Sequence, residues 1–167
     1  IWQYTSRQPG LPVQQPLPGD LGIFALKIKC RDIKTAQQFY LTNKNVSISP
    51  VMTAPDGRPH CWLKDAYGNH FELVEADDWF KKDAGITGGV AGAVIGVSNM
   101  EKAVHFYKEL LGIDTISYQV TAPLTDGPGW QDTAGVFNRV LLKKELSGQG
   151  AFSKLLGGVQ VELLEAK

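Results

Sequence analysis

Hydrophobic and polar residues alternate along most of the short apolar runs of the chain, and two further runs follow a helical period. Alternation is typical of strands with one buried face, and apolar residues three and four positions apart are typical of amphipathic helices. In the first half the pattern predicts a helix over 33–43 and strands over 23–30, 46–53, 60–65 and 70–75. In the second half it predicts a helix over 100–111 and strands over 90–97, 115–121, 136–143 and 158–164. Both halves therefore follow the order strand, helix and three strands.

The two halves also resemble one another residue by residue. A shift of 67 residues superposes 22–40 on 89–107 with five identities, among them Phe39-Tyr40 with Phe106-Tyr107. The closing strands, Phe-Glu-Leu-Val-Glu at 71–75 and Val-Glu-Leu-Leu-Glu at 161–165, lie 90 residues apart. The difference between the two offsets gives the second copy 23 extra residues, which we expect in the Gly- and Pro-rich stretches 121–135 and 144–158.

These patterns predict an α+β fold of two repeated βαβββ modules. The first module is expected over 22–76, a linker over 77–88, and the second module, with longer loops, over 89–167. Residues 1–21 are interpreted as a strand tail and linker, because Ile-Trp-Gln-Tyr at 1–4 has the pattern of a strand end. That tail suggests a preceding module, so the chain is expected to be a piece of a longer protein.

The most specific motif is the turn into the closing strand of the first copy. Residues 65–73 are Asp-Ala-Tyr-Gly-Asn-His-Phe-Glu-Leu. Together with the repeated βαβββ order, this motif resembles the vicinal oxygen chelate superfamily, which holds glyoxalase I, extradiol dioxygenases and bleomycin-resistance proteins. Ala66 and Tyr67 stand where the superfamily has Pro and Asp. The resemblance implies paired modules whose sheets curl around a cleft, and suggests the central part of a four-module member.

The resemblance assigns Glu72 and Glu162 to the metal-carboxylate and catalytic positions of that cleft. It implies a divalent ion, with Fe, Mn, Ni and Zn as alternatives. The family's histidine ligands are absent, because the expected first-strand positions are Ala25 and Gly92. Two carboxylates without an imidazole make a hard and weak oxygen site, so the ligand set is incomplete.

Other residues are expected to line the cleft because strand alternation turns their side chains toward it. Lysine ammonium groups, imidazoles and an indole there would suit a planar or oxygenated ligand. The alternative for the lysines is a solvated strand face, and for the rings it is ordinary packing. The candidate substrate-binding residues are Lys27, Lys29, His60, Trp62 and His70.

Composition narrows the class of partner. Seventeen Lys and Arg balance seventeen Asp and Glu, giving a net charge of zero and an isoelectric point near 7.0, so no overall field favours nucleic acid or an anionic membrane. The apolar runs are far shorter than the ~20 residues of a membrane helix. Isolated Cys30 and Cys61 indicate reduced thiols and a cytoplasmic location. We expect a small-molecule ligand and either a homodimer or paired modules.

Three functions remain open from the sequence. The first is a divalent-metal-assisted enzyme acting on a small oxygenated substrate, as a glyoxalase-like lyase or isomerase or as an extradiol-type dioxygenase. The second is a metal-free, bleomycin-resistance-like protein that binds a small molecule, and the absent histidines favour it within these residues. The third is a vestigial scaffold module of a longer enzyme.

Overall fold

The computed structural model describes residues 14–79, 85–130, 135–144 and 158–167, and the strand pattern expected at 1–4 lies outside them. Within these residues the first module has one helix and five strands, and the second has one helix and four strands. The first contains β1 (Gly22–Cys30), α1 (Ile33–Leu41), β2 (Ser47–Ile48), β3 (Met52–Thr53), β4 (Pro59–Lys64) and β5 (His70–Glu75). The second contains β6 (Thr87–Gly96), α2 (Met100–Leu111), β7 (Thr115–Pro123), β8 (Val136–Lys143) and β9 (Gln160–Ala166).

The α+β class and the repeated modules are confirmed, with two local differences. The strand expected over 46–53 is divided into β2 and β3, because Pro50 lies between them and has no N–H for a strand ladder. The first strand of the second module begins at Thr87, inside the linker expected over 77–88.

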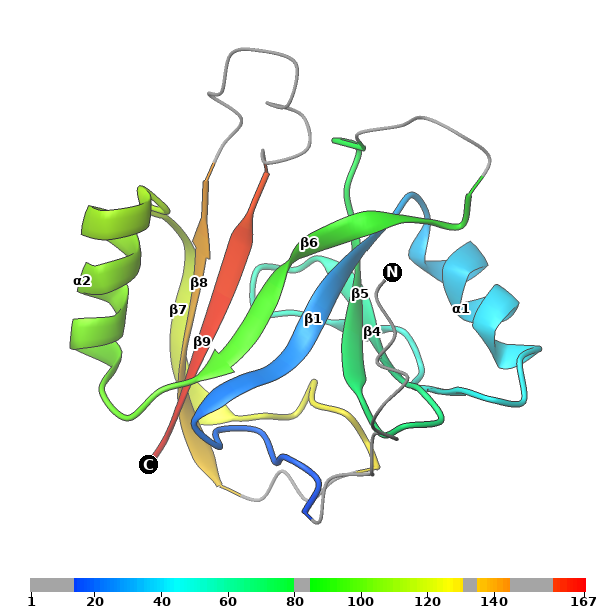
Figure 1. Cartoon of the computed structure of the whole chain (residues 1–167), viewed down its shortest axis with the longest axis horizontal. Helices are drawn as coiled ribbons and strands as arrows, with labels where there is room; N and C mark the ends of the chain where they lie inside the picture. Colours follow the sequence, from blue (N-terminus) through cyan, green and yellow to red (C-terminus); the bar gives the residue numbers. More distant parts are fainter. Residues whose placement is uncertain (1–13, 80–84, 131–134, 145–157) are drawn as a thin grey trace, which may run out of the picture.

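Both modules belong to one continuous sheet, shown in Figure 1, with the order β2-β4-β5-β1-β6-β9-β8-β7 and β3 paired to β4. Within each module the first and last strands are parallel neighbours, β1 with β5 and β6 with β9. The modules join through β1 and β6, which pair antiparallel. The first strand of each module therefore lies at the centre of the sheet.

The helices begin and end where the local sequence favours it. Asp32 caps α1 by accepting a hydrogen bond from the Thr35 backbone N–H at 2.7 Å, and Asn99 caps α2 through Lys102 at 2.8 Å. The second helix ends at Gly112, whose φ of 61° is the left-handed conformation that glycine adopts without strain.

The two helices cover one face of the sheet, which we call the outer face. Under α1, Ile33 and Ala36 pack against Cys30, Cys61 and Leu73. The α2 side has its own cluster, made of buried and half-buried residues that include Met100, Ile113, Val140, Leu142, Val161 and Leu163. The opposite, inner face carries an apolar cluster shared by both modules, with Phe24, Ala25, Trp62, Val94 and Leu164.

The connection between β7 and β8 reaches from the second module to the inner face of the first. The Trp62 indole Nε1 donates a hydrogen bond of 2.7 Å to the backbone oxygen of Asp126 in this connection. None of the helices in the described ranges has the length and hydrophobicity that crossing a bilayer requires.

Candidate functional site

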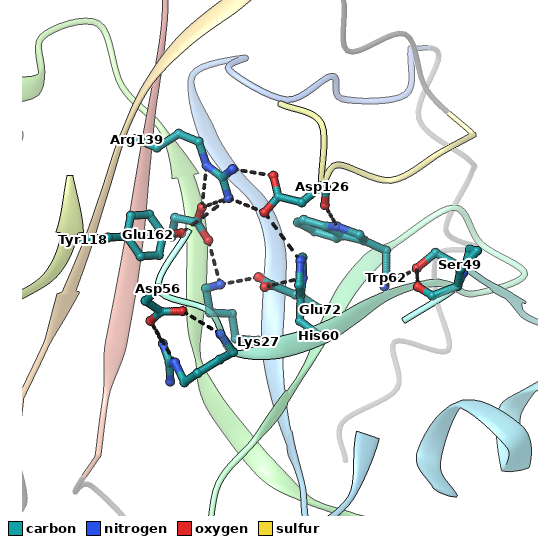
Figure 2. A network of polar contacts seen from close by, with 12 residues as sticks. Lys27, Ser49, Asp56, His60, Trp62, Glu72, Tyr118, Asp126, Arg139 and Glu162 are labelled. Atoms are coloured by element: carbon teal, nitrogen blue, oxygen red, sulfur yellow. Dashed lines mark hydrogen bonds and ion pairs between the residues drawn. The ribbon is translucent and has the colours of Figure 1, made fainter. Parts of the chain in front are cut away.

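Six titratable side chains are buried together on the inner face where the modules meet (Figure 2). Each is at most 7% exposed. Burying a charge is costly unless another charge or a hydrogen bond compensates it, so such a group is a candidate functional site. The residues are Lys27 on β1, His60 on β4, Glu72 on β5, Asp126 between β7 and β8, Arg139 on β8 and Glu162 on β9.

Lys27 lies between the two glutamates that the sequence assigns to the closing strands. Parallel pairing puts Lys27 of β1 opposite Glu72 of β5. The Lys27 ammonium donates to Glu72 Oε2, and to Glu162 Oε2 at 2.7 Å. One ammonium group therefore joins a carboxylate of the first module to a carboxylate of the second.

Arg139 makes a second link between carboxylates. Its Nε and one terminal nitrogen lie 3.1 and 2.7 Å from Glu162 Oε1. The guanidinium also donates to both oxygens of Asp126, the two-pronged arrangement that suits an arginine and a carboxylate. The Tyr118 hydroxyl lies 3.4 Å from the same guanidinium.

His60 closes the group on the side of the first module. Its Nδ1 lies 2.9 Å from Glu72 Oε1, and its Nε2 lies 3.5 Å from Asp126 Oδ2. Burial alone would lower the pKa of His60, but Asp126 and Glu72 raise it to about 9. His60 is therefore protonated at neutral pH and can donate a proton but not accept one.

The same contacts stabilise the charged forms of other side chains in the group. Burial opposes the charge on Lys27, yet Glu162 and Glu72 raise its pKa above the ordinary value. Burial likewise opposes ionisation of Glu162, while Lys27 and Arg139 hold its pKa well below the ordinary range. For Asp126, His60 and Arg139 overcome the effect of burial and lower the pKa. Three cationic groups therefore face three acidic groups.

A small cavity adjoins the Lys27 ammonium on the inner face. Its volume is about 20 Å³, which accommodates one water-sized group. The lining includes His60, Glu72 and Tyr118, and it extends to Arg58, whose side chain is 38% exposed. Gln160 also lines the cavity, and its buried side-chain oxygen has no hydrogen-bond partner among the described residues. An unpaired buried amide oxygen favours an occupant that can donate a hydrogen bond.

The residues present do not fit the divalent ion that the sequence resemblance implies. The described part of the chain contains no group of three or more His, Cys, Asp or Glu side chains placed to hold a metal. Between Glu72 and Glu162, the contact position is taken by the Lys27 ammonium, a cation with no lone pair to offer.

The strand register shows which first-strand residues lie opposite the two glutamates. Ala25 lies opposite His70, and Gly92 lies opposite Gln160. The residues opposite Glu72 and Glu162 are Lys27 and Val94, two positions further along each strand. Neither offers an imidazole.

The substrate-binding residues predicted from the sequence lie in different surroundings. His60 and Lys27 belong to the charged group, and Trp62 packs beside it with its indole bound to Asp126. Lys29 instead pairs with Asp78 at 2.8 Å. Direct contact of these residues with a substrate stays a prediction.

His70 shares the inner face with Glu72, but its ring lies edge-on to Phe24 with 4.9 Å between centroids. It makes no hydrogen bond to a described residue, and burial, followed by the nearby Lys64, lowers its pKa. His70 is therefore held among aromatic rings and not among the carboxylates.

Arg139, Asp126 and Gln160 were missed by the sequence analysis. Arg139 interrupts an apolar strand, Val-Phe-Asn-Arg-Val-Leu-Leu, and a lone arginine there was a signal for a buried ion pair. Asp126 lies in a Gly- and Pro-rich connection, where nothing local indicates that it reaches the other module.

The continuous sheet of two βαβββ modules, with its buried centre at their junction, has the modular arrangement that the sequence predicts. The two repeated modules are thus confirmed, and membership of the superfamily stays a prediction. No protein-family model matches the sequence, and a search of curated proteins finds no relative.

Solved structures of similar fold include two methylmalonyl-CoA epimerases. The enzyme of Streptomyces coelicolor, in complex with 2-nitronate-propionyl-CoA, is 14% identical with a TM-score of 0.46, covering 87% of this chain and 96% of that one. The enzyme of Mycobacterium tuberculosis is 15% identical with a TM-score of 0.47, covering 87% and 88%. A provisionally assigned dioxygenase of Bacillus subtilis is 18% identical with a TM-score of 0.49, covering 87% of this chain and 41% of that one.

Proposed function

We propose that the chain binds a small oxygenated molecule at the inner face without a metal ion, using the Lys27 ammonium as its source of positive charge. The observation that carries this proposal is the position of Lys27, buried between two carboxylates and beside a cavity. The ammonium has three N–H donors, and the described contacts use two of them. One donor is left for an oxygen of the ligand.

The cavity supplies the second half of the recognition. A ligand oxygen that accepts from Lys27 would lie near the unpaired Gln160 oxygen, which requires a donor. A molecule with a carbonyl next to a hydroxyl offers both groups. Most of such a molecule would extend past the water-sized cavity toward Arg58, where the lining reaches the surface.

The same arrangement suits chemistry in which negative charge develops on the bound oxygen. A fixed ammonium in a buried site stabilises an oxyanion without reorganisation. His60, which is protonated at neutral pH and lines the cavity, can supply a proton to that oxygen. We therefore propose oxyanion stabilisation and proton donation as the chemistry of the site.

A second candidate function is a structural module. The observation in its favour is the small size of the cavity together with three cations that are already paired with three acids. In that case a single water would satisfy Gln160 and Lys27, and no ligand would compete for them.

Titration of isotope-labelled protein with hydroxyacetone distinguishes the two candidates, with acetone as the probe that lacks the hydroxyl. We expect saturable NMR shifts of the Gln160 side-chain amide with hydroxyacetone, and weaker binding of acetone. Lys27→Met is expected to weaken binding roughly 10- to 100-fold, because it removes a charged hydrogen-bond donor.

Lys29→Met is the matched control, since Lys29 is a buried lysine of the same strand that pairs away from the centre. It should bind hydroxyacetone like the unmodified chain. Absence of any saturable shift in the folded, unmodified chain would refute the binding function and leave the structural one.

A further inference from the structure

We infer that Lys27 is a tethered cation that replaces a divalent ion at the module junction and keeps such ions out. The inference rests on the proposed function and adds that the site contains a latent metal position. Removal of the ammonium, with the two glutamates kept, is expected to turn the centre into a divalent-metal site.

The first step of the argument is the geometry of the acceptors. Glu72 and Glu162 come from the closing strands of different modules, and each directs its Oε2 at the same Lys27 nitrogen. Their side chains are 4% and 2% exposed, so water does not compensate them. Two buried carboxylates that converge on one point are a cation-binding arrangement.

The second step is the set of donors around that point. His60 does not add to the donors, because it is protonated at neutral pH and its Nδ1 lies 2.9 Å from the other oxygen of Glu72. An imidazole placed at position 27 would add a nitrogen between the two carboxylates. Two carboxylate oxygens and that one imidazole nitrogen form a three-ligand donor set that Zn²⁺ and Mn²⁺ accept, with water in the remaining positions.

The third step is the exclusion of metal from the unmodified protein. The Lys27 side chain is 2% exposed and rises from the central strand of the sheet, so it has no solvent-exposed position to which it can easily withdraw. An entering ion would meet an ammonium of like charge and would also approach the Arg139 guanidinium, which contacts Glu162. Both cations therefore oppose a divalent ion.

The sequence repeat supports Lys27 as the tethered cation, because the second module has no equivalent of it. Val94 occupies the position of the second module that corresponds to Lys27, and it lies opposite Glu162. The second module thus provides a carboxylate but no cation on its own first strand. The ammonium of Lys27 therefore contacts the glutamates of both modules.

The test compares the purified Lys27→His and Lys27→Ala variants of the 167-residue chain with the unmodified chain, each exposed to Zn²⁺ or Mn²⁺ and then dialysed. Metal content is measured by mass spectrometry, and affinity by calorimetry. We expect no stoichiometric ion in the unmodified chain and one ion per chain in Lys27→His, with weaker binding by Lys27→Ala. The metal should also raise the melting temperature of Lys27→His and leave that of the unmodified chain unchanged.

Two control variants test whether the ion binds between Glu72 and Glu162. Lys29→His adds an imidazole to the same strand and should bind no ion, because its neighbour is Asp78 and not a pair of glutamates. Adding Glu162→Gln to Lys27→His should abolish the gained metal.

Stoichiometric metal in the unmodified chain that is lost in Glu162→Gln would overturn the inference. So would folded Lys27→His and Lys27→Ala proteins, verified by circular dichroism, that bind no ion. If the Lys27 variants do not fold, the metal content of the unmodified chain and of Glu162→Gln still tests the inference. Failure of hydroxyacetone to bind would instead refute the proposed function and leave the metal result standing by itself.

Discussion

At the scale of single residues, Lys27 holds together two carboxylates that would otherwise repel one another in a dry environment. Taking each ion out of water costs several kcal/mol, and the mutual contacts return that energy only while both partners are present. Glu72 and Glu162 are almost fully buried, so loss of Lys27 leaves them without solvent compensation. The effect of losing Lys27 on the free energy of unfolding should therefore depend strongly on pH.

We expect Lys27→Met to lower the free energy of unfolding by about 3–5 kcal/mol at neutral pH. In the unmodified chain the pKa of Glu162 is depressed, so its contribution is present above its unfolded pKa and is lost on acidification. Without the ammonium, Glu162 loses one of the cations that lower its pKa, so that pKa rises and protonation relieves the variant. Urea unfolding near pH 7 and pH 5 should thus show a smaller deficit at the lower pH.

Lys29→Met provides the comparison for this experiment. Asp78, the partner of Lys29, has a side chain that is 25% exposed, so water compensates its charge in part. A deficit equal to that of Lys27→Met, with the same pH dependence, would contradict the role assigned to Lys27.

We expect a second pH effect from His60. Whereas the effect of Glu162 lowers the free energy of unfolding as the pH falls, that of His60 lowers it as the pH rises. Its folded pKa of about 9 lies above the ordinary value of 6.5, so protonation favours the folded state. That stabilisation is complete below about pH 6.5 and is lost as the pH rises through the folded pKa. We expect a loss of about 2 kcal/mol between roughly pH 6 and pH 8.5.

The measurement is urea unfolding across that range, with NMR titration of the imidazole as the direct reading of its pKa. Burial raises the pKa of Cys30 and Cys61 to about 12, so these thiols remain protonated in the folded protein over this range. His60→Gln should flatten the profile. A His60 imidazole that titrates near its ordinary pKa would count against the contacts with Asp126 and Glu72.

Sequence reasoning pointed to the glutamates, Lys27 and His60, but not to Arg139 or Asp126. Glu72 and Glu162 repeat in equivalent strand endings, and that pattern is visible in one dimension. Arg139 reaches Glu162 because β8 and β9 pair, and Asp126 reaches His60 because a long connection crosses to the other module. Neither contact has a fixed spacing in the sequence, so three-dimensional information was needed.

At the scale of elements, the pairing of β6 with β9 depends on the absence of a side chain at Gly92. A Cβ there would collide with the backbone oxygen of Gln160. Backbone atoms move less easily than a flexible side chain, so the strands would have to separate. The strand also adjoins β1 on its other side, where Gly92 lies opposite Lys27.

We therefore expect Gly92→Ala to lower the free energy of unfolding by about 1–3 kcal/mol. Gly129→Ala is the matched control, because a Cβ at Gly129 meets no atom of the described part of the chain within 4 Å. That control should stay within about 0.5 kcal/mol of the unmodified chain. Equal stability of the two variants in urea would contradict the close strand contact.

The elements themselves were largely predictable from the chain. Alternation and helix caps gave β5, β8 and α2 their correct bounds, since these segments have clear periodicity and local signals. The segment 46–53 was predicted as one strand because alternation alone does not register the interruption by Pro50. Strand order was not predicted, because periodicity does not reveal which strands pair.

At the scale of the whole molecule, the modules share one sheet and one buried charged group. The β1–β6 pairing and the contacts of Lys27 and Arg139 with Glu162 link structure on both sides of the junction. Unfolding one module would therefore leave the other with an open strand edge and unpaired buried charges. The homodimer, the further modules and the cytoplasmic location expected from the sequence stay predictions.

We expect the two modules to unfold in a single cooperative transition. Far-ultraviolet circular dichroism, tryptophan fluorescence and NMR signals from each module should give the same denaturation midpoint. Separate midpoints for signals from 22–76 and 89–167 would show that the junction does not couple them.

The mismatch between Lys27 and Val94 makes the two halves of this near-symmetric molecule non-interchangeable. A pairing of two first modules would bring two lysines to two copies of Glu72, whereas a pairing of two second modules would bring none to two copies of Glu162. Only the mixed pair places one ammonium between two glutamates. One side chain, that of Lys27, therefore determines that a first module pairs correctly with a second module and not with another copy of itself.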